Sequence, residues 1–483
     1  MDEIELKLQL SPASADQVKA SEALPRTWRT VQQRAIYFDT KDRTLAAAGM
    51  SLRIRESEDQ RVQTIKAPGR SAGGLFSRSE WERPVSANNP VIDETTPVQA
   101  LLAQAGELMR AFEVEVSRRI WDFTDGDTRI EVVLDRGTVS AGDRQTPVCE
   151  LELELKAGSP QALFDLARTL DGEAAARLGV LTKSERGERL AQALSPAVKA
   201  GPVSLAPDMT AAEAFQAILQ ACIKHFRVNE DLLFPARAPE ALHQARVALR
   251  RMRSAFSIFG PLLGTDAARD LRDRLRQLAA ELGQARDLDV LLQRAQPGPL
   301  RDRLRTEREA AYDRVEEVLE AAATRGLMLD VTEWASSGPW LGEPDHEKDR
   351  NLSARAFAAH ALKRFRRKVK KGGKDLAHLE DEARHELRKD AKKLRYAAEF
   401  FAPLFDGKRE SVRQKAFMAA LEDVQDHLGA LNDLATAPQV LDRLGIADEP
   451  EASALLAGGK KKALLAQAAE AHGDLVDAAR YWR

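Results

Sequence analysis

Two stretches of the sequence alternate charged and aliphatic residues, Glu3-Ile4-Glu5-Leu6-Lys7 and Glu150-Leu151-Glu152-Leu153-Glu154-Leu155-Lys156. Successive side chains of a strand point to opposite faces, so each stretch predicts a strand with its carboxylates on one face. That face can be solvated, or it can line a cavity and hold a divalent cation, since Mg²⁺ and Mn²⁺ prefer oxygen ligands. Taken alone, the two stretches leave both interpretations open.

The first part of the chain contains further stretches with a two-residue period, separated by Gly and Asp turns. These stretches are Arg34–Asp39, Met50–Arg55, Val62–Lys66, Ser77–Glu82, Val116–Trp121 and Arg129–Asp135. With the two glutamate strands they predict at least eight strands, and helices are expected near residues 12–21, 95–110 and 160–178. Eight antiparallel strands favour a closed barrel, because closure removes the unpaired edges of a sheet.

The composition is that of a globular protein with more than one domain. Of 483 residues, 43% are hydrophobic and 31% are charged, which excludes an intrinsically disordered chain. Cys149 and Cys222 are far apart, so they give no disulfide framework or thiolate metal site and fit a reducing compartment. No signal peptide precedes the first strand, and no apolar run reaches the length of a membrane span. We therefore expect a cytoplasmic protein with no membrane partner.

A change of composition after the last predicted strand predicts a domain boundary. Residues 195–207 are rich in proline and small side chains, and Thr210-Ala-Ala-Glu213 then forms a capping box that begins a helix. From there to the end of the sequence, the apolar residues follow the helical period. We predict an α+β domain over residues 1–197, a linker over 198–208 and an all-α domain over 209–483.

The all-α part contains an internal duplication. Three landmarks recur in the same order, and the matching stretches are His243–Arg253 with His385–Arg395, Leu282–Leu288 with Leu428–Leu434, and Ile223–Phe226 with Leu362–Phe365. Such recurrence indicates two copies of one supersecondary unit. We predict that the copies cover about residues 209–345 and 346–483.

Basic residues of the first domain follow the same alternation as the carboxylates. Arg53 and Arg55, for example, share one face of their strand. A lumen with carboxylates on some strands and cations on others is unfavourable if it is empty and dry. It becomes favourable when a metal ion held by carboxylates bridges phosphate oxygens and basic side chains neutralise the remaining charge. The pattern predicts polyphosphate chemistry without a P-loop, since GxxxxGK[ST] does not occur.

Several of these motifs together resemble the CYTH family, the triphosphate tunnel metalloenzymes. The motifs are the opening Glu-x-Glu-x-Lys, Tyr37-Phe38-Asp39-Thr40, Leu52-Arg53-Ile54-Arg55, Thr64-Ile65-Lys66 and the later Glu-Leu-Glu-Leu-Glu, in the family's order over residues 1–195. The resemblance implies an eight-stranded antiparallel tunnel with flanking helices, a requirement for Mg²⁺ or Mn²⁺, and hydrolysis of triphosphates.

The same resemblance assigns roles to individual residues. It implies that the metal ligands are Glu3, Glu5, Glu150, Glu152 and Glu154. The residues implied in catalysis are Glu3, Glu5, Lys7, Glu150 and Glu152. The triphosphate would be bound by Lys7, Arg53, Arg55, Lys66, Arg118 and, in a final short strand or turn, Lys183. Further members of the site, with no separate role assigned, are Glu80, Glu82 and Asp135.

In the second domain, each copy carries one histidine followed by a row of cations. On a helix these residues form one stripe per copy, made of 243, 246, 250 and 253 in the first and 385, 388, 392 and 395 in the second. A row of like charges destabilises a helix and needs a counterion, so the duplicated stripe indicates an anion-binding surface. No carboxylate or second histidine lies three or four positions along either stripe, which disfavours a metal site.

The duplicated stripes resemble the CHAD domain, a helical domain found beside CYTH domains. The resemblance covers residues 209–483 and implies paired four-helix units, a pseudo-twofold axis and a basic surface that binds inorganic polyphosphate. The implied binding residues are His243, Arg246, Arg250, Arg253, His385, Arg388, Lys392 and Arg395, with a basic extension at Lys363, Arg364, Arg367, Lys370 and Lys371. Nucleic acid fits the same electrostatics, but the stripes lack interleaved aromatic residues, which disfavours a single-stranded ligand.

We therefore predict that the first domain hydrolyses inorganic triphosphate to pyrophosphate and phosphate. The second domain is predicted to bind polyphosphate and could place the enzyme on polyphosphate granules. Adenylyl cyclase and thiamine triphosphatase are alternative activities of the same tunnel. A non-catalytic polyphosphate sensor or scaffold is an alternative of another class, and the intact set of carboxylates disfavours it.

Overall fold

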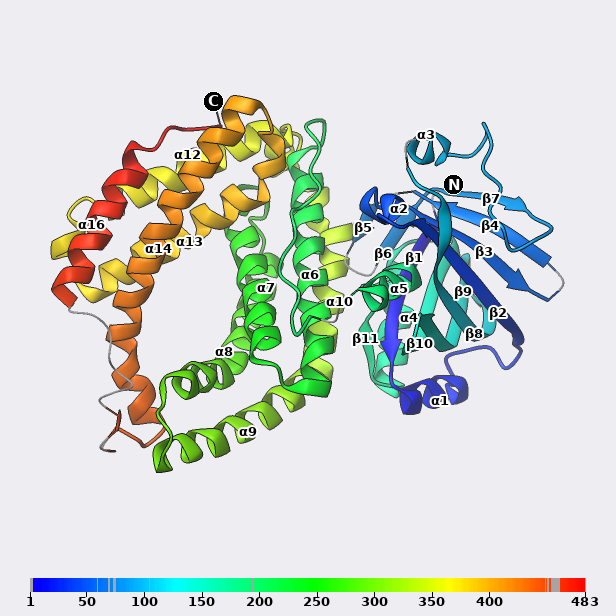
Figure 1. The fold of residues 1–483 in the computed structure, drawn as a ribbon, viewed down its shortest axis with the longest axis horizontal. Coiled ribbons are helices and arrows are strands. Elements are labelled where there is room, and N and C mark those ends of the chain that lie inside the picture. The colour runs from blue at the N-terminus through cyan, green and yellow to red at the C-terminus, as the bar shows by residue number, and fades with distance from the viewer. Residues whose placement is uncertain are drawn as a thin grey trace. The chain divides into compact units, whose positions relative to one another are not determined.

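The computed structural model describes residues 3–58, 60–67, 70–72, 75–103, 105–192, 195–447, 449, 451–452 and 461–482. The chain forms two compact units (Figure 1). The tunnel unit comprises Met1–Val198, Ile223–Leu232 and Leu319–Gly338. The helical unit comprises Lys199–Cys222, Leu233–Val318 and Pro339–Arg483. The predicted fold class, α+β followed by all-α, is confirmed, and two helical segments from beyond the predicted linker belong to the tunnel unit.

The tunnel unit is built on one antiparallel sheet. Its strands are β1 (Glu3–Leu10), β2 (Arg29–Thr40), β3 (Ser51–Ser57), β4 (Gln60–Lys66), β5 (Arg70–Ala72), β6 (Leu75–Arg78), β7 (Glu80–Pro84), β8 (Leu108–Asp125), β9 (Thr128–Ala141), β10 (Arg144–Ala157) and β11 (Ala176–Leu178). They pair in the order β5-β6-β1-β10-β9-β8-β2-β3-β4-β7, and β11 also pairs with β1. A continuous run of eight strands, β1 to β4 and β7 to β10, confirms the predicted tunnel, to which the short β5, β6 and β11 are additions.

The two ends of this run are joined by one chain segment. β6 pairs with β1 at one end, and β7 pairs with β4 at the other. Only Ser79 separates β6 from β7, and its carbonyl accepts a hydrogen bond from Ala67 N at 3.2 Å. The prediction of a single strand over Ser77–Glu82 is therefore wrong. The alternation of side chains in the sequence continues through Ser79, so it does not reveal that one strand ends there and another begins. At Ser79 the chain passes from the β1 end of the run to the β4 end.

The aliphatic face of β1 and β10 is covered by a helix. Leu6, Leu8 and Leu153 are completely buried on this face, and α4 (Gln161–Glu173) packs on both strands with its buried Phe164. Burying one such side chain contributes about 1.5–3 kcal/mol. With this face fixed outward against α4, the alternating charged side chains must point into the tunnel.

Shorter helices flank the rest of the sheet, namely α1 (Pro12–Ala20), α2 (Thr44–Ala47), α3 (Gln99–Leu102) and α5 (Lys183–Ala191). The helices predicted near residues 12–21 and 160–178 are confirmed by α1 and α4. The helix predicted near residues 95–110 is wrong for most of its length. Pairing with β2 extends β8 back to Leu108, so sheet formation overrides the local helical pattern there.

The remainder of the chain is helical. Its helices are α6 (Ala211–Ala236), α7 (Pro239–Ile258), α8 (Asp266–Arg294), α9 (Pro299–Glu320), α10 (Ala322–Ser337), α11 (Glu347–Arg350), α12 (Ala354–Gly372), α13 (Asp381–Phe400), α14 (Lys408–Arg443) and α16 (Lys461–Asp477). The predicted capping box begins α6, since Glu213 N donates to Thr210 Oγ1 at 3.2 Å and Thr210 N donates to Glu213 at 2.9 Å. Among the described helices, none combines the length and apolar character needed to cross a bilayer.

The two repeats of the helical unit meet at equivalent positions. Thr210 is the N-cap of α6, Ser353 is the N-cap of α12, and the two residues form an isolated antiparallel bridge. The N–H that follows each cap donates to the carbonyl that precedes the other cap, at 2.8 and 2.7 Å. Phe259 and Phe401, the C-caps of the equivalent helices α7 and α13, have ring centroids 5.7 Å apart. This reciprocal pattern is that of a local twofold axis.

Candidate functional site

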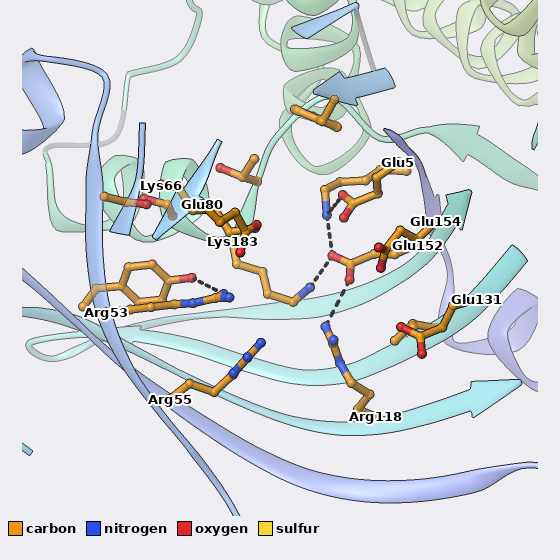
Figure 2. Close-up of a pocket in the computed structure, with 17 residues that line it drawn as sticks. Glu5, Arg53, Arg55, Lys66, Glu80, Arg118, Glu131, Glu152, Glu154 and Lys183 are labelled. Atoms are coloured by element: carbon orange, nitrogen blue, oxygen red, sulfur yellow. Dashed lines mark hydrogen bonds and ion pairs between the residues drawn. The ribbon is translucent and has the colours of Figure 1, made fainter. Parts of the chain in front are cut away.

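A cavity inside the tunnel unit is lined by seventeen residues from nine strands and the start of α5 (Figure 2). The basic residues are Lys7, Arg53, Arg55, Lys66, Arg118 and Lys183. The carboxylates are Glu5, Glu80, Glu131, Glu152 and Glu154. The remaining lining residues are Tyr37, Ser51, Phe76, Val133, Thr182 and Ser184. The structure thus brings to one cavity all six cations that were predicted to bind triphosphate.

The strand register places charged residues in rows across one wall. Lys7 of β1 is opposite Glu152 of β10, and Glu5 is opposite Glu154. Glu154 is in turn opposite Glu131 of β9. Like charges on directly opposed residues repel each other unless a cation lies near them. Each member of the row already has a protein cation beside it, since Glu5 pairs with Lys7, Glu154 with Lys156 and Glu131 with Arg29. A divalent ion that binds the row Glu5, Glu154 and Glu131 would replace or supplement these cations.

Lys183 is the centre of a buried ionic network. Its Nζ lies 2.7 Å from Asp135, 2.5 Å from Glu150 and 2.8 Å from Glu152. Arg118 donates to Asp135 at 2.9 and 2.6 Å and to Glu152 at 3.0 Å. Burial would lower the pKa of Lys183, but the three carboxylates outweigh it and raise this pKa well above its ordinary value. Burial would likewise raise the pKa of Glu152, but Lys183 and the neighbouring cations hold it well below its ordinary range.

The three carboxylates around Lys183 do not all face the cavity. Glu152 lines it, whereas Glu150 and Asp135 are only 2% and 0% exposed and do not. One oxygen from each lies within 4.8 Å of the others, a spacing that suits a metal ion, but the Lys183 ammonium contacts all three. Glu150, a predicted metal ligand, is thus placed in an ionic network away from the cavity wall. The cause is α5, which packs on β8, β9 and β10 and brings Lys183 onto these carboxylates.

Two other predicted carboxylates pair with neighbouring cations. Glu80 lines the cavity and pairs with Lys66. Glu82 accepts a hydrogen bond from Arg55 at 3.3 Å and does not line the cavity. The backbone of Glu3 begins β1, but its side chain lies outside the described residues.

The opposite wall carries a cation with less compensation. Arg53 donates from Nη1 to Tyr37 Oη at 3.4 Å. Its Nε is buried and has no hydrogen-bond partner in the part of the chain that the structure describes. Burial, followed by repulsion from Arg53, lowers the pKa of the adjacent Arg55. A buried donor without a partner costs about 1–3 kcal/mol, so this wall favours an anionic ligand.

The N-terminus of α5 contributes three lining residues. Thr182 is the N-cap, Lys183 is the first helical residue, and Glu185 completes a capping box with Thr182. The prediction of a strand or turn at Lys183 is therefore wrong, although the motif Thr182-x-x-Glu185 is a helix-start signal visible in the sequence. The free N–H groups of a helix N-terminus attract anions. Lining residues that the sequence prediction missed are Tyr37, Ser51, Phe76, Glu131, Val133, Thr182 and Ser184.

In the helical unit, the two predicted stripes lie on the equivalent helices α7 and α13. Arg250 of α7 donates from Nε to Tyr396 Oη of α13 at 2.7 Å. Burial, followed by repulsion from Arg250 and Arg388, lowers the pKa of Lys392 to about 7. Cations from both repeats are therefore close enough to repel one another, and we call Arg250, Arg388 and Lys392 the basic cluster.

Three of the other stripe residues have partners within their own repeat. These partners are Ala279 O for Arg246 at 2.9 Å, Asn432 Oδ1 for His385 at 3.0 Å and Glu399 for Arg395 at 2.8 Å. Burial, followed by repulsion from Arg286, lowers the pKa of His243 to about 4, so this histidine is neutral at pH 7. Burial, followed by repulsion from Arg276, Arg272 and Arg250, lowers the pKa of Arg253. Cations that the sequence prediction missed are Arg272, Arg276 and Arg286 of α8.

The predicted basic extension lies on α12. Its exposed members are Lys363, Arg367, Lys370 and Lys371. Arg364 is partly buried, donates to Ile258 O at 2.6 Å and lies 4.8 Å from the ring centroid of Phe365. Its guanidinium is thus held by the end of α7.

Comparison with known proteins identifies relatives of both units. The family model of the CYTH domain matches residues 1–187, and that of the CHAD domain matches residues 217–442. An inorganic triphosphatase of Haemophilus influenzae is 32% identical over 199 residues, which are 39% of this chain and 54% of that protein. The chain therefore spans about half the length of this relative.

Two further relatives have regions that match the helical part of this chain. An uncharacterized protein of Mycobacterium tuberculosis is 29% identical over 413 residues, or 76% of each chain. The crystal structure of the CHAD domain from Ricinus communis covers 57% of this chain and 92% of that one, with 30% identity and a TM-score of 0.47.

Replacing Lys183 with Met should destabilise the tunnel unit, because Asp135, Glu150 and Glu152 would stay buried without their shared cation. Removing one partner from a buried ionic network typically costs about 3–5 kcal/mol. Urea unfolding of the full chain at pH 7 measures this loss. The variant Lys183→Met/Glu150→Gln is the matched control and should recover part of the loss, because it also removes one negative charge.

The loss should depend on pH. Since the pKa of Glu152 in the folded state lies below its ordinary value of 4.5, its ionised form contributes stability above pH 4.5 that disappears as the pH falls through the folded-state pKa. In Lys183→Met the buried carboxylates take up protons more readily, so the deficit relative to the wild type should shrink from pH 7 to about pH 4. An equal deficit at both pH values would contradict the ionic network.

Proposed function

Because the chain belongs to the proteins that carry a CYTH domain followed by a CHAD domain, we propose that its tunnel hydrolyses inorganic triphosphate to pyrophosphate and phosphate. One observation carries the proposal. Six basic side chains line a cavity in which the Nε of Arg53 is buried without a partner among the described residues. The similarity to the inorganic triphosphatase of H. influenzae supports the same substrate.

The negative charge of the substrate could be neutralised by cations from two walls of the cavity. Arg53, Arg55 and Lys66 lie on the neighbouring strands β3 and β4 and would bind phosphate oxygens directly. Arg118 and Lys183 are anchored by carboxylates, so their positions are fixed before the substrate arrives. Fixed cations around the phosphates stabilise the charge that spreads over the oxygens in phosphoryl transfer.

We also propose a divalent-cation site on the carboxylate wall. Glu5, Glu154 and Glu131 lie on three adjacent strands with Glu152 beside them, and they offer the oxygen ligands that Mg²⁺ and Mn²⁺ prefer. Three of these residues, Glu5, Glu152 and Glu154, belong to the ligand set predicted from the sequence. A bound ion would polarise phosphate oxygens and lower the pKa of the attacking water.

Replacing Arg53 with Met should lower kcat/KM for tripolyphosphate about 100- to 1,000-fold, the usual loss for one charge-stabilising donor. Phosphate release with Mg²⁺ or Mn²⁺ measures it. Arg61→Met is the matched control, because Arg61 is an exposed cation of β4 that pairs with Glu56 at 2.6 Å and does not line the cavity. Equal rates in the two variants would contradict the proposed role. A wild-type protein that releases no phosphate from any triphosphate would instead favour the non-catalytic scaffold.

For the helical unit we propose binding of inorganic polyphosphate at the basic cluster of α7 and α13. A linear polyanion has regularly spaced charges, so one chain could contact cations of both repeats. Bound phosphate groups would neutralise the charges of Arg250, Arg388 and Lys392. They would thereby remove the repulsion that, together with burial, lowers the pKa of Lys392. Such binding could bring substrate to the protein or place it on polyphosphate granules.

Charge reversal in the variant Arg250→Glu/Lys392→Glu should abolish polyphosphate binding, because it replaces two cations of the cluster with anions. The rate of triphosphate hydrolysis should not change. Titration with polyphosphate at low salt and the phosphate-release assay measure the two activities. The variant Arg269→Glu/Lys408→Glu is the control, since it makes the same charge change at exposed positions of α8 and α14. Loss of both activities would show that the two sites are not separable.

A second cavity favours a second class of substrate. It shares Tyr37, Ser51 and Ser184 with the first cavity, and its other walls include the apolar side chains of Met50 and Met109. Its lining also includes the charged residues Asp39, Lys41, Arg43, Arg110 and Glu188. A partly apolar cavity beside a triphosphate site suits the organic part of a nucleotide or of thiamine triphosphate.

A panel of tripolyphosphate, thiamine triphosphate and ATP, each with Mg²⁺ and with Mn²⁺, separates the candidates. We expect the fastest phosphate release from tripolyphosphate, because the cations of the first cavity would bind only the phosphate groups of a substrate. Faster hydrolysis of thiamine triphosphate would assign the second cavity to its organic part. Cyclic AMP formed from ATP and Mn²⁺ would indicate an adenylyl cyclase and reject our choice.

A further inference from the structure

One part of α6 belongs to the tunnel unit. The segment Ile223–Leu232 lies beyond the predicted linker and within the region that the CHAD model matches, yet it packs in the tunnel unit. Two of its cations, Lys224 and Arg227, contact the residues that flank the turn before Lys183. Arg227 binds Leu178 on the upstream side, and Lys224 binds Glu185 on the downstream side. Neither cation lines the cavity itself.

Lys224 acts on the downstream side of this turn. Its Nζ forms an ion pair with Oε1 of Glu185, the third residue of α5. The other oxygen of Glu185, Oε2, accepts hydrogen bonds from Thr182 N at 2.9 Å and from Thr182 Oγ1 at 3.1 Å. One carboxylate therefore ties the α6 cation to Thr182, which lines the cavity together with Lys183 and Ser184.

Arg227 acts on the upstream side. It is only 1% exposed, and its Nε donates to Leu178 O at 2.8 Å. Leu178 ends β11, which pairs with β1, and Gly179 N donates to Lys7 O at 2.8 Å. A Cβ at position 179 would lie 3.0–3.3 Å from Lys7 atoms, so the chain passes closely over this cavity residue.

Leu178 and Glu185 are thus both held by α6, and the residues between them include three that line the cavity. We propose that Lys224 is a positioning residue of the triphosphate site, which acts through Glu185 to fix Thr182, Lys183 and Ser184. The inference rests on the proposed function for its substrate. It adds to that function a contribution from the chain beyond the linker.

An ordinary surface ion pair would behave differently. The side chains of Lys224 and Glu185 are 40% and 27% exposed, and pairs of this kind add little to stability. A pair with only that role would leave substrate binding unchanged when it is removed. A positioning role predicts weaker binding of triphosphate at nearly unchanged thermal stability.

The test uses the full chain and the variant Lys224→Met, which keeps the length of the side chain and removes its charge. We expect KM and the Kd for tripolyphosphate to rise about two- to five-fold with kcat nearly unchanged, a range set by the strength of partly exposed ion pairs. Lys224→Arg should restore both values. Lys19→Met is the matched control, because Lys19 pairs with Asp16 at 2.9 Å on α1 and does not line the cavity.

A double-mutant cycle tests the route through Glu185. Glu185→Gln can still accept the capping hydrogen bonds but loses the ion pair. Adding Lys224→Met to Glu185→Gln should therefore cause no further loss, and additive losses would overturn the proposal. It would also be overturned if Lys224→Met and Lys19→Met gave the same Kd. A wild type that binds tripolyphosphate without hydrolysing it would reject the proposed function alone, because the Kd comparison would still decide the role of Lys224.

Discussion

The tunnel depends on the pairing of most of the charges that it buries. Lys183 satisfies this requirement for Asp135, Glu150 and Glu152, and Arg118 links two of the same carboxylates again. The wall that contains Arg53 is not compensated in this way, since its Nε is buried without a partner among the described residues. Because a buried donor without a partner is unfavourable, this difference between the walls supports the proposal that the anionic substrate binds beside Arg53.

The helical unit concentrates positive charge by symmetry. Each repeat contributes one helix with a row of cations, and burial together with repulsion from Arg250 and Arg388 lowers the pKa of Lys392 to about 7. An anion bound there would favour the protonated amine, so binding would be accompanied by proton uptake near neutral pH. The tunnel unit instead offsets most of its cations internally, which suits a site where charges must keep fixed positions.

Local periodicity was sufficient to predict several of the charged side chains that line the cavity. Glu5, Lys7, Arg53 and Arg55 lie where strand alternation predicts, because alternation is a property of the backbone itself. Prediction failed where distant segments decide the outcome. Glu150 has the same parity as Glu152, yet it pairs with Lys183 of α5 and does not reach the cavity. Likewise, no local pattern reveals that part of α6 packs in the tunnel unit, while the role of Glu3 stays a prediction.

The bridge between Thr210 and Ser353 has a consequence for how the helical unit assembles. Each repeat supplies one donor and one acceptor, so neither repeat can complete the pair of hydrogen bonds by itself. A single copy could form them only by association with a second chain, and its stability would then depend on protein concentration. Fusion of the two copies makes this association intramolecular. The symmetric interface therefore persists at any dilution.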